Sequence, residues 1–194
     1  MIDKCRENLP LFNGDFVAEA VGSFSVTEKS EGGAGSVTFT SATPCIVFCT
    51  HPRTPLLWAL ENKKCADGAF LTFSQGQVHL HLVELKSRLA SAEWSHAKLQ
   101  FSGMFLTAIA ACRVMDITEI ASVTCYIAFT KNKMNPEASA NPVLLKTLVG
   151  RANPLNGQSD WEKEEVHLPH STVAGLRKIE RDEATKNGVF ALAA

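Results

Sequence analysis

The sequence predicts an α/β protein in which a central mixed β-sheet is flanked by helices, with an extra β-hairpin near the N-terminus. Two runs of strand-forming residues, 65–73 and 78–86, flank a short glycine-bearing connection and predict a hairpin. A helical pattern begins at Ser91 and reaches about Met115, and a clear strand follows at 123–130. A strand reached through a helix is normally parallel to the strand before it, so the sheet is expected to be mixed.

The composition fits one folded domain that spans residues 1–194. Domains commonly contain about 100 to 200 residues, and a hydrophobic content of 45% with a net charge of −1 excludes an intrinsically disordered chain. The near-neutral charge also argues against a protein that coats nucleic acid with a strongly basic surface. A nucleic-acid enzyme of this composition would need a local basic patch, a metal ion or a partner subunit.

The cysteines and the apolar segments predict a cytoplasmic protein without a membrane partner. The six cysteines form no Cys-X-X-Cys pair and have no zinc-finger spacing with histidine. Cys45, Cys49 and His51 could be metal ligands, but buried thiols on a strand explain the pattern better. The first residues lack the apolar core of a signal peptide, and no apolar run reaches the roughly 18 residues of a transmembrane helix.

Several short elements precede the central hairpin. The glycine-rich segment 30–35 lacks the Lys-Ser/Thr ending of a phosphate-binding loop and is interpreted as a solvated turn between two strands. Thr54 as N-cap and Pro55 in the first turn predict a short helix. The expected elements are a helix or strand at 16–21, hairpin strands at 23–29 and 36–41, a buried strand at 45–49 and a helix at 56–62.

The helix after the hairpin has one apolar face, because its large hydrophobic residues recur at helical spacing. This face is expected to lie in the core, whereas Lys98 is expected at the surface. The apolar stripe consists of Trp94, Ala97, Phe101, Met104 or Phe105, Ala108, Ile109 and Cys112. Beyond the strand at 123–130, the sequence predicts a short helix at 143–149, a strand at 162–168 and a charged helix at 174–186.

The second strand of the hairpin carries Glu84 and Lys86 on one face, because side chains alternate with a period of two. If the strands pair around the turn at Gln75-Gly76, the numbers of facing residues sum to about 151, which places Asp67 opposite Glu84. Two facing carboxylates repel each other by about 0.2 to 1 kcal/mol, and a hard cation such as Mg²⁺ between them reverses the sign. Lys86 could then orient or deprotonate a water molecule.

Other catalytic chemistries find less support in the sequence. His79 and His81 lie on the strand face opposite Glu84, so they are excluded from the same site and are expected to have a structural or interface role. The chain has no Gly-X-Ser-X-Gly elbow, and no cysteine has a neighbour that would make it a thiolate.

Asp67, the triplet Glu84-Leu85-Lys86 and a following helix that carries Gln100 resemble the PD-(D/E)XK nuclease superfamily. Ala66 stands where that family has its proline. The resemblance implies a restriction-endonuclease-like core, and the catalytic residues that it implies are Asp67, Glu84, Lys86 and Gln100.

The resemblance extends over about residues 50–130 and leaves 131–194 as a C-terminal elaboration or an interaction region. It implies Mg²⁺ as the cofactor, with Mn²⁺ as a substitute. In that family a further acidic residue often comes from a helix before the hairpin, and either Glu61 or Glu19 could supply it here. The expected metal ligands are Asp67, Glu84, Glu61 and Leu85.

The function implied by the resemblance is metal-dependent hydrolysis of phosphodiester bonds. DNA, preferably double-stranded, is the expected substrate, and single-stranded DNA or RNA stays open. The small size and near-neutral charge favour an effector or subunit of a larger complex, such as an anti-phage defence complex, with a protein partner or a second copy of the chain. The alternative is a catalytically silent binding or assembly subunit of the same fold, in which Asp67, Glu84 and Lys86 form a buried ion network.

Overall fold

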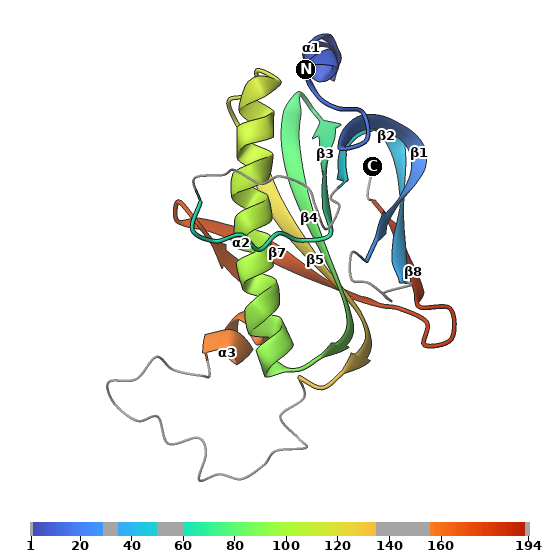
Figure 1. Cartoon of the computed structure of the whole chain (residues 1–194), viewed down its shortest axis with the longest axis vertical. Coiled ribbons are helices and arrows are strands. Elements are labelled where there is room, and N and C mark those ends of the chain that lie inside the picture. The colour runs from blue at the N-terminus through green and yellow to red at the C-terminus, as the bar shows by residue number, and fades with distance from the viewer. Residues whose placement is uncertain (1, 29–34, 50–59, 135–155, 193–194) are drawn as a thin grey trace.

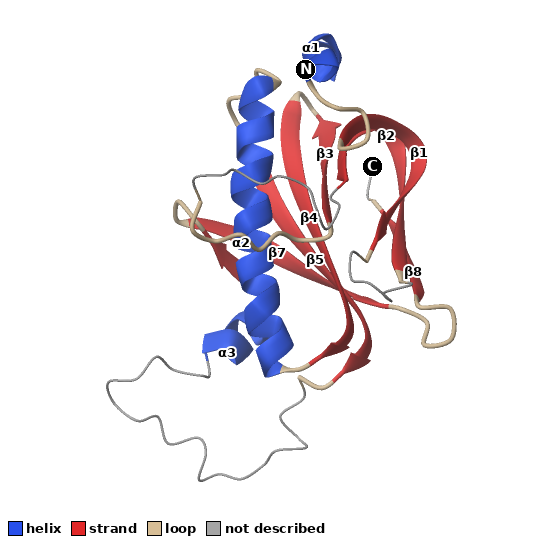
Figure 2. Cartoon of the chain, in the orientation of Figure 1, coloured by secondary structure: helices blue, strands red, loops and turns tan. Residues whose placement is uncertain are grey.

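In the computed structural model, which describes residues 2–28, 35–49, 60–134 and 156–192, an eight-stranded sheet packs against one long helix (Figures 1 and 2). The strand order is β1-β2-β3-β4-β5-β7-β6, and β8 pairs with β2 outside this path. The strands are β1 (Val17–Thr27), β2 (Ser36–Cys49), β3 (Gly68–Ser74), β4 (Gln77–Leu89), β5 (Ser122–Asn132), β6 (Glu165–Leu168), β7 (Thr172–Glu180) and β8 (Asn187–Ala191).

The pairing in this sheet is mixed, as the sequence predicts. Strands β1 to β4 are joined by antiparallel pairs, whereas β5 is parallel to both β4 and β7. The order β2, β3, β4, helix, β5 therefore places a parallel strand after a helical crossover, which is the connection expected from the sequence. The protein is an α/β protein with helices against a partly parallel sheet.

The longest helix, α2 (Ser91–Val114), lies across one face of the sheet (Figure 1). At its start the Glu93 carboxylate accepts a hydrogen bond from the backbone N–H of Ala90 (3.2 Å), which caps the first turn. The predicted stripe from Trp94 to Cys112 is buried, apart from Ile109, which is partly buried. The other helices are α1 (Ile2–Asn8), the 3₁₀ turn η1 (Leu9–Leu11) and α3 (Asn156–Lys163), which lies near the first turn of α2 in Figure 1.

The hairpin of β3 and β4 has the predicted register. Gly68 pairs with Val83 and Ser74 pairs with Gln77, so the turn falls at Gln75-Gly76. Both turn residues have positive φ angles (49° and 76°), as a two-residue turn of the primed type requires. The predicted pairing of the N-terminal hairpin is also confirmed, because the ends of β1 and β2 pair around the 30–35 segment.

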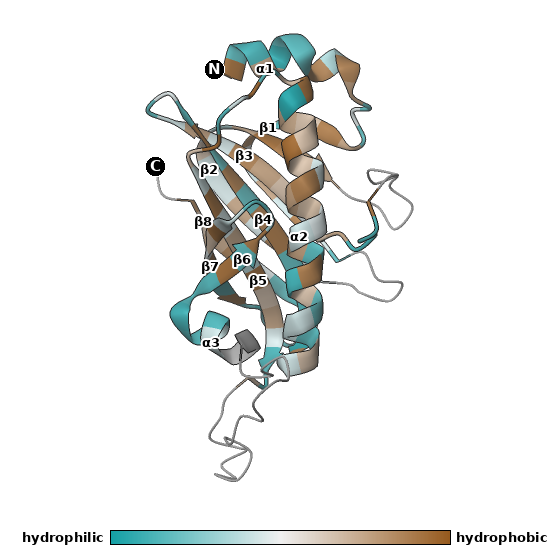
Figure 3. Ribbon diagram, turned by 90° about the vertical axis from the view of Figure 1, so that its left-hand side faces the viewer, coloured by the Kyte–Doolittle hydropathy of each residue, from teal (hydrophilic) through white to brown (hydrophobic). Residues whose placement is uncertain are grey.

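The two faces of the sheet bury two separate hydrophobic clusters. The first lies between the sheet and α2, where Figure 3 shows hydrophobic residues on both elements. It includes Leu80, Leu82 and Phe101. The second includes Phe39 of β2 and Tyr126 of β5, whose ring centroids lie 5.3 Å apart. Because β3 and β4 separate these two strands in the sheet order, the sheet must curl for the rings to touch. β8 pairs with β2 outside the main strand order.

Two expectations about single elements need correction. Residues 45–49 do not form a separate strand, because β2 runs without a break from Ser36 to Cys49. The charged helix predicted at 174–186 is wrong: these residues form most of β7, a turn and no helix. In β7 burial alternates between Ala174 and Leu176 inside and Gly175 and Arg177 outside, which is the period of a strand.

Other expected elements are shorter than predicted or lie outside the described residues. Residues 16–21, left open as helix or strand, contribute to β1, and the strand expected at 162–168 begins at Glu165. Residues 60–62 are not helical, and the remainder of the helix expected at 56–62 lies outside the described residues, as does the helix expected at 143–149. In the described part of the chain, no helix is long and apolar enough to cross a membrane.

Candidate active site

Asp67 and Glu84 meet where β3 begins. The pairing of β3 with β4 ends at Gly68↔Val83, and Asp67 is the residue just before β3, where it contacts its predicted partner Glu84. The backbone N–H of Asp67 donates a hydrogen bond to Glu84 Oε2 (3.2 Å), and the N–H of Leu85 donates to Asp67 Oδ2 (2.8 Å). The Asp67 carboxylate is therefore held by the backbone of β4, and the Glu84 carboxylate is held by the backbone of the segment just before β3. These reciprocal bonds fix both side chains.

Lys86 and Gln100 join the two carboxylates in one cluster. Lys86 Nζ lies 2.5 Å from Glu84 Oε1 and donates a hydrogen bond to Gln100 Oε1 (2.7 Å). Gln100 extends from α2, and its Nε2 donates to the carbonyl oxygen of Cys65 (3.4 Å). The backbone carbonyl of Gln100 accepts the N–H of Ala66 (3.1 Å). The helix, the hairpin and the segment before β3 thus converge on the four predicted catalytic residues.

The cluster is buried although most of its members are charged. Glu84 is 1% exposed and Asp67 is 6% exposed, whereas the Lys86 side chain is 18% exposed. A buried carboxylate is costly unless it is paired and hydrogen-bonded, and both carboxylates here are hydrogen-bonded. Arg181 adds a further positive charge, because its guanidinium interacts electrostatically with Asp67.

His96 and Lys64 lie near the cluster, although the sequence analysis did not assign them to the site. The pKa of His96 is lowered by partial burial and by the positive charges of Lys64 and Lys86. Both His96 and Lys64 are exposed, and the two lysines, Lys64 and Lys86, give this end of α2 a locally positive character. The sequence could have identified His96 as a neighbour of the site, because it lies four residues before Gln100 and such residues lie on the same side of a helix. Lys64 gave no comparable signal.

The additional acidic ligands do not join the cluster. Glu61 is exposed and lies in a bend outside any helix. Glu19 is on β1, where its carboxylate binds Arg6 through two short contacts (2.6 and 2.9 Å). Among residues with described positions, no group of three or more His, Cys, Asp or Glu side chains could hold a metal ion. Leu85 offers only its backbone carbonyl, because its side chain is buried in the second cluster.

The two histidines of β4 lie on the other face of the sheet, as the period of two predicts. His81 stacks on Phe70 of β3, with ring centroids 4.4 Å apart and an interplanar angle of 11°.

Lys98, which was expected at the surface, forms an ion pair with Asp160 of α3 (2.8 Å) instead of extending into solvent.

Chemically, the cluster offers two oxygen-donor carboxylates, one ammonium group beside them and an amide that holds the ammonium. Such a set can bind one hard divalent cation, or it can compensate its own charges as a buried ion network. No protein-family model, curated protein or solved structure matches the chain.

Proposed function

We propose that the chain is a metal-dependent nuclease that hydrolyses phosphodiester bonds in DNA, built on a restriction-endonuclease-like core of β2, β3, β4, α2 and β5. The observation that carries the proposal is the single hydrogen-bonded cluster of Asp67, Glu84, Lys86 and Gln100. These four residues come from sequence positions up to 33 residues apart (100 − 67), and all four are buried or half-buried. This combination is the one that the resemblance implies.

The donor atoms of the cluster fit a hard divalent cation. Mg²⁺ and Mn²⁺ prefer oxygen ligands, and Mg²⁺ is usually held by one or two protein carboxylates together with water and phosphate oxygens. The carboxylates of Asp67 and Glu84 would hold the ion, with the backbone carbonyl of Leu85 as a further oxygen. A bound ion would supply Lewis acidity and lower the pKa of a coordinated water molecule.

The protein groups around this position have separate tasks. Lys86 orients the attacking water and balances the negative charge that builds up on the phosphate. Gln100 is a positioning residue, since its amide oxygen accepts a hydrogen bond from Lys86 Nζ. The exposed ammonium group of Lys64 attracts the phosphate backbone of the substrate toward the partly exposed Lys86.

The preferred substrate is double-stranded DNA, cut by an effector or subunit that acts with a protein partner or a second copy of the chain. A chain with a net charge of −1 has little general attraction for a polyanion. A partner that holds the DNA would compensate for this.

The second candidate function is a catalytically silent binding or assembly subunit with the same fold. It is favoured by one specific observation: both carboxylate oxygens of Glu84 already have partners within the protein, Lys86 for Oε1 and the Asp67 N–H for Oε2. In this case the cluster fixes the junction between the hairpin and α2, and no metal binds.

The two candidates differ in metal binding and in cleavage. We expect calorimetric titration to detect Mn²⁺ binding by the native chain, and we expect plasmid and linear duplex DNA to be cut in Mg²⁺ or Mn²⁺. Asp67→Asn removes a ligand charge and should abolish both signals. Lys86→Met should keep Mn²⁺ binding but lower the cleavage rate by about 10²-fold or more, because it removes a group that handles protons and charge.

The matched control is Glu119→Gln, which neutralises an exposed carboxylate outside the cluster and should leave both signals unchanged. Single-stranded DNA and RNA serve as competing substrates, and an EDTA sample tests the metal requirement. Absence of Mn²⁺ binding in the folded native chain, together with absence of cleavage, would reject the nuclease and favour the assembly subunit.

A further inference from the structure

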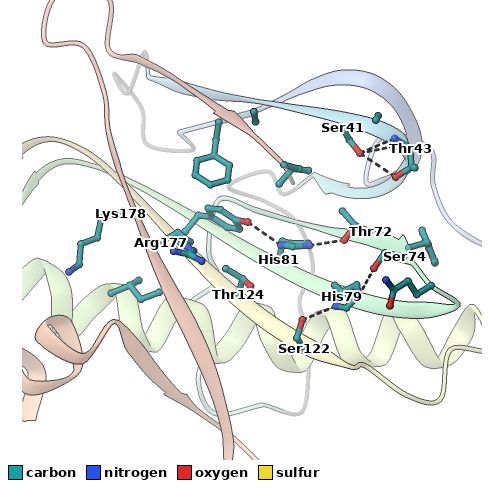
Figure 4. A pocket seen from close by; sticks show the side chains of 18 of the residues that line it. Ser41, Thr43, Thr72, Ser74, His79, His81, Ser122, Thr124, Arg177 and Lys178 are labelled. Carbon is teal, nitrogen blue, oxygen red and sulfur yellow. Dashed lines mark hydrogen bonds between the residues drawn. The ribbon is translucent and has the colours of Figure 1, made fainter. Parts of the chain in front are cut away.

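A pocket of about 810 Å³ opens on the sheet face opposite α2 (Figure 4). Residues of β2, β3, β4, β5, β7 and β8 line it, so it occupies one end of the curled sheet. The pocket and Asp67 lie at opposite ends of β3. Asp67 comes just before its first residue, whereas Thr72 and Ser74, which line the pocket, are at its C-terminal end. Its volume and its place at the mouth of a curled sheet are typical of small-molecule sites.

Two histidines organise the polar side of the pocket. His81 Nε2 lies 2.9 Å from Thr72 Oγ1, and His81 Nδ1 lies 3.3 Å from the hydroxyl of Tyr126. Burial, and secondarily the neighbouring His79, lowers the pKa of His81 to about 3, so the ring is neutral at pH 7. A neutral imidazole donates through one nitrogen and accepts through the other, so these bonds fix the rotation of both hydroxyl groups.

His79 forms a second chain of the same kind. Its Nε2 lies 2.9 Å from Ser74 Oγ, and its Nδ1 lies 2.8 Å from Ser122 Oγ. Thr124, which also lines the pocket, is the neighbour of His81 on β5. Figure 4 shows the two histidines along the middle of the pocket with hydroxyl-bearing side chains on both sides. The pocket therefore presents a row of oriented hydroxyl groups to a ligand.

Arg177 brings a positive charge to the same pocket. It is exposed, it is the neighbour of Tyr126 on β7, and within the described residues it forms no ion pair. Lys178, in contrast, is engaged by Glu164 (3.1 Å) and by the ring of Trp161 (4.4 Å to the centroid). The guanidinium of Arg177 is thus the group available for an anion, and guanidinium groups bind phosphate through two parallel hydrogen bonds.

The pocket is better equipped for binding than for acid–base catalysis. Glu164 is the one carboxylate among the described residues that line it, and this group is paired with Lys178. Both histidines are bonded to hydroxyl groups on each side, so neither has the carboxylate partner that orients a catalytic base. Phe190 and Tyr126, 5.1 Å apart between centroids, add an aromatic wall.

From this arrangement we infer that the pocket binds a small phosphate ester that carries several hydroxyl groups, of the size of a sugar phosphate or a nucleoside monophosphate. The phosphate binds Arg177, and the sugar hydroxyl groups bind the oriented side chains around His79, His81 and Thr124. The site lies on the other sheet face from Asp67 and does not depend on the proposed nuclease activity.

The test is calorimetric titration of the full chain at pH 7.5 with ribose 5-phosphate, adenosine 5′-monophosphate, inorganic phosphate and adenosine. We expect the two phosphate esters to bind at least about tenfold more tightly than phosphate or adenosine, because only the esters reach both halves of the pocket. Tighter binding of ribose 5-phosphate would identify a sugar-phosphate site, and tighter binding of the monophosphate would identify a nucleotide site.

Single-residue variants test whether the phosphate esters bind in this pocket. Arg177→Gln should weaken ester binding at least about tenfold, and the nearly isosteric Thr124→Val should weaken it severalfold. Arg113→Gln removes an exposed arginine of α2 and should change nothing, and Asp67→Asn should also leave ester binding intact. The inference is overturned if neither ester binds more tightly than phosphate, if folded Arg177→Gln and Thr124→Val bind as the native chain does, or if Asp67→Asn abolishes binding.

Discussion

Glu84 is tolerated inside the protein because Lys86 and a backbone N–H supply the interactions that water would otherwise provide. Breaking one half of a buried ion pair typically costs about 3 to 5 kcal/mol, since the remaining charge is left uncompensated. A loss of cleavage in a Lys86 variant must therefore be compared with its unfolding curve. Exchange of both charges for neutral groups, Glu84→Gln with Lys86→Met, is expected to cost less than the sum of the single changes.

Arg181 is the second buried charge near the cluster. Its side chain is 1% exposed and lies 3.6 Å from Glu28, and its Nη1 donates to the carbonyl of Lys186 (3.2 Å). Its Nε and Nη2 have no hydrogen-bond partner in the described part of the chain. Burial lowers the pKa of Arg181, although Glu28 and Asp67 oppose this effect. The positive charge of Arg181 is thus compensated mainly by its electrostatic interaction with the carboxylates of Glu28 and Asp67 rather than by direct hydrogen bonds.

His81 should make the stability of the protein depend on pH. The unfolded chain takes up a proton at this ring below about pH 6.5, whereas burial and His79 delay protonation of the native ring to about pH 3. Its contribution to stability is thus present above pH 6.5 and is lost as the pH falls toward 3. Between pH 7 and pH 5 the native chain should lose about 2 kcal/mol more unfolding free energy than His81→Gln.

Urea unfolding at pH 7, 6 and 5 measures this difference. His167→Gln, which changes an exposed histidine, should follow the native curve. If the curves of native protein and His81→Gln run parallel, the ring is not held neutral in the native state.

At the scale of elements, α2 and the segment before β3 make an unusually close contact. A Cβ atom on Gly103 would lie 1.8 Å from the carbonyl oxygen of Lys64, and the Asn62 side chain donates to the carbonyl of Leu99 (2.9 Å). The helix therefore carries glycine where the backbone of another segment passes over it. This contact sets the position of the chain three residues before Asp67.

Gly103→Ala should destabilise the protein by about 1 to 3 kcal/mol, because the carbonyl of Lys64 is backbone and cannot rotate away. Alanine favours a helix over glycine by about 1 kcal/mol, which opposes the effect of the clash. The sign of the change in unfolding free energy therefore shows whether the clash or the helix propensity is larger. Urea unfolding gives the answer, with Ser95→Ala as a control on an exposed position of the same helix. A stabilised Gly103→Ala variant would mean that the segment moves freely.

At the scale of the whole molecule, β8 brings the C-terminal part of the chain beside β2. Its residues pair in parallel with β2 from Ser36↔Asn187 to Thr40↔Ala191, and Phe190 packs on Phe39 and Tyr126. The side chain of the preceding residue, Val189, is 75% exposed. In β8, Phe190 therefore packs against the second cluster, whereas its neighbour Val189 extends into solvent.

Phe190→Ala should therefore lower the free energy of unfolding by about 2 kcal/mol, less than a fully buried phenylalanine because the ring is only half-buried. Val189→Ala should stay within about 0.5 kcal/mol of the native value. Equal effects of the two changes, measured by urea unfolding, would contradict the inward position of Phe190.

The sequence by itself determined the β3–β4 hairpin, its register and the faces of its side chains. A two-residue turn and a period of two are local properties, so Asp67, Glu84 and Lys86 could be placed on one face from their numbers alone. The stripe of α2 was determined in the same way and placed Gln100 on the helix that covers this face.

Only the tertiary structure decided the roles of the C-terminal strands and of the flanking acidic residues. The charged residues 174–186 are compatible with a helix until β5 and β6 supply strand partners for β7. The partner of β8 is β2, which lies 151 positions away along the chain. Glu19 was a candidate ligand until its contact with Arg6 was known. Such choices depend on hydrogen-bond partners distant in sequence, and these leave no periodic signal in the residues themselves.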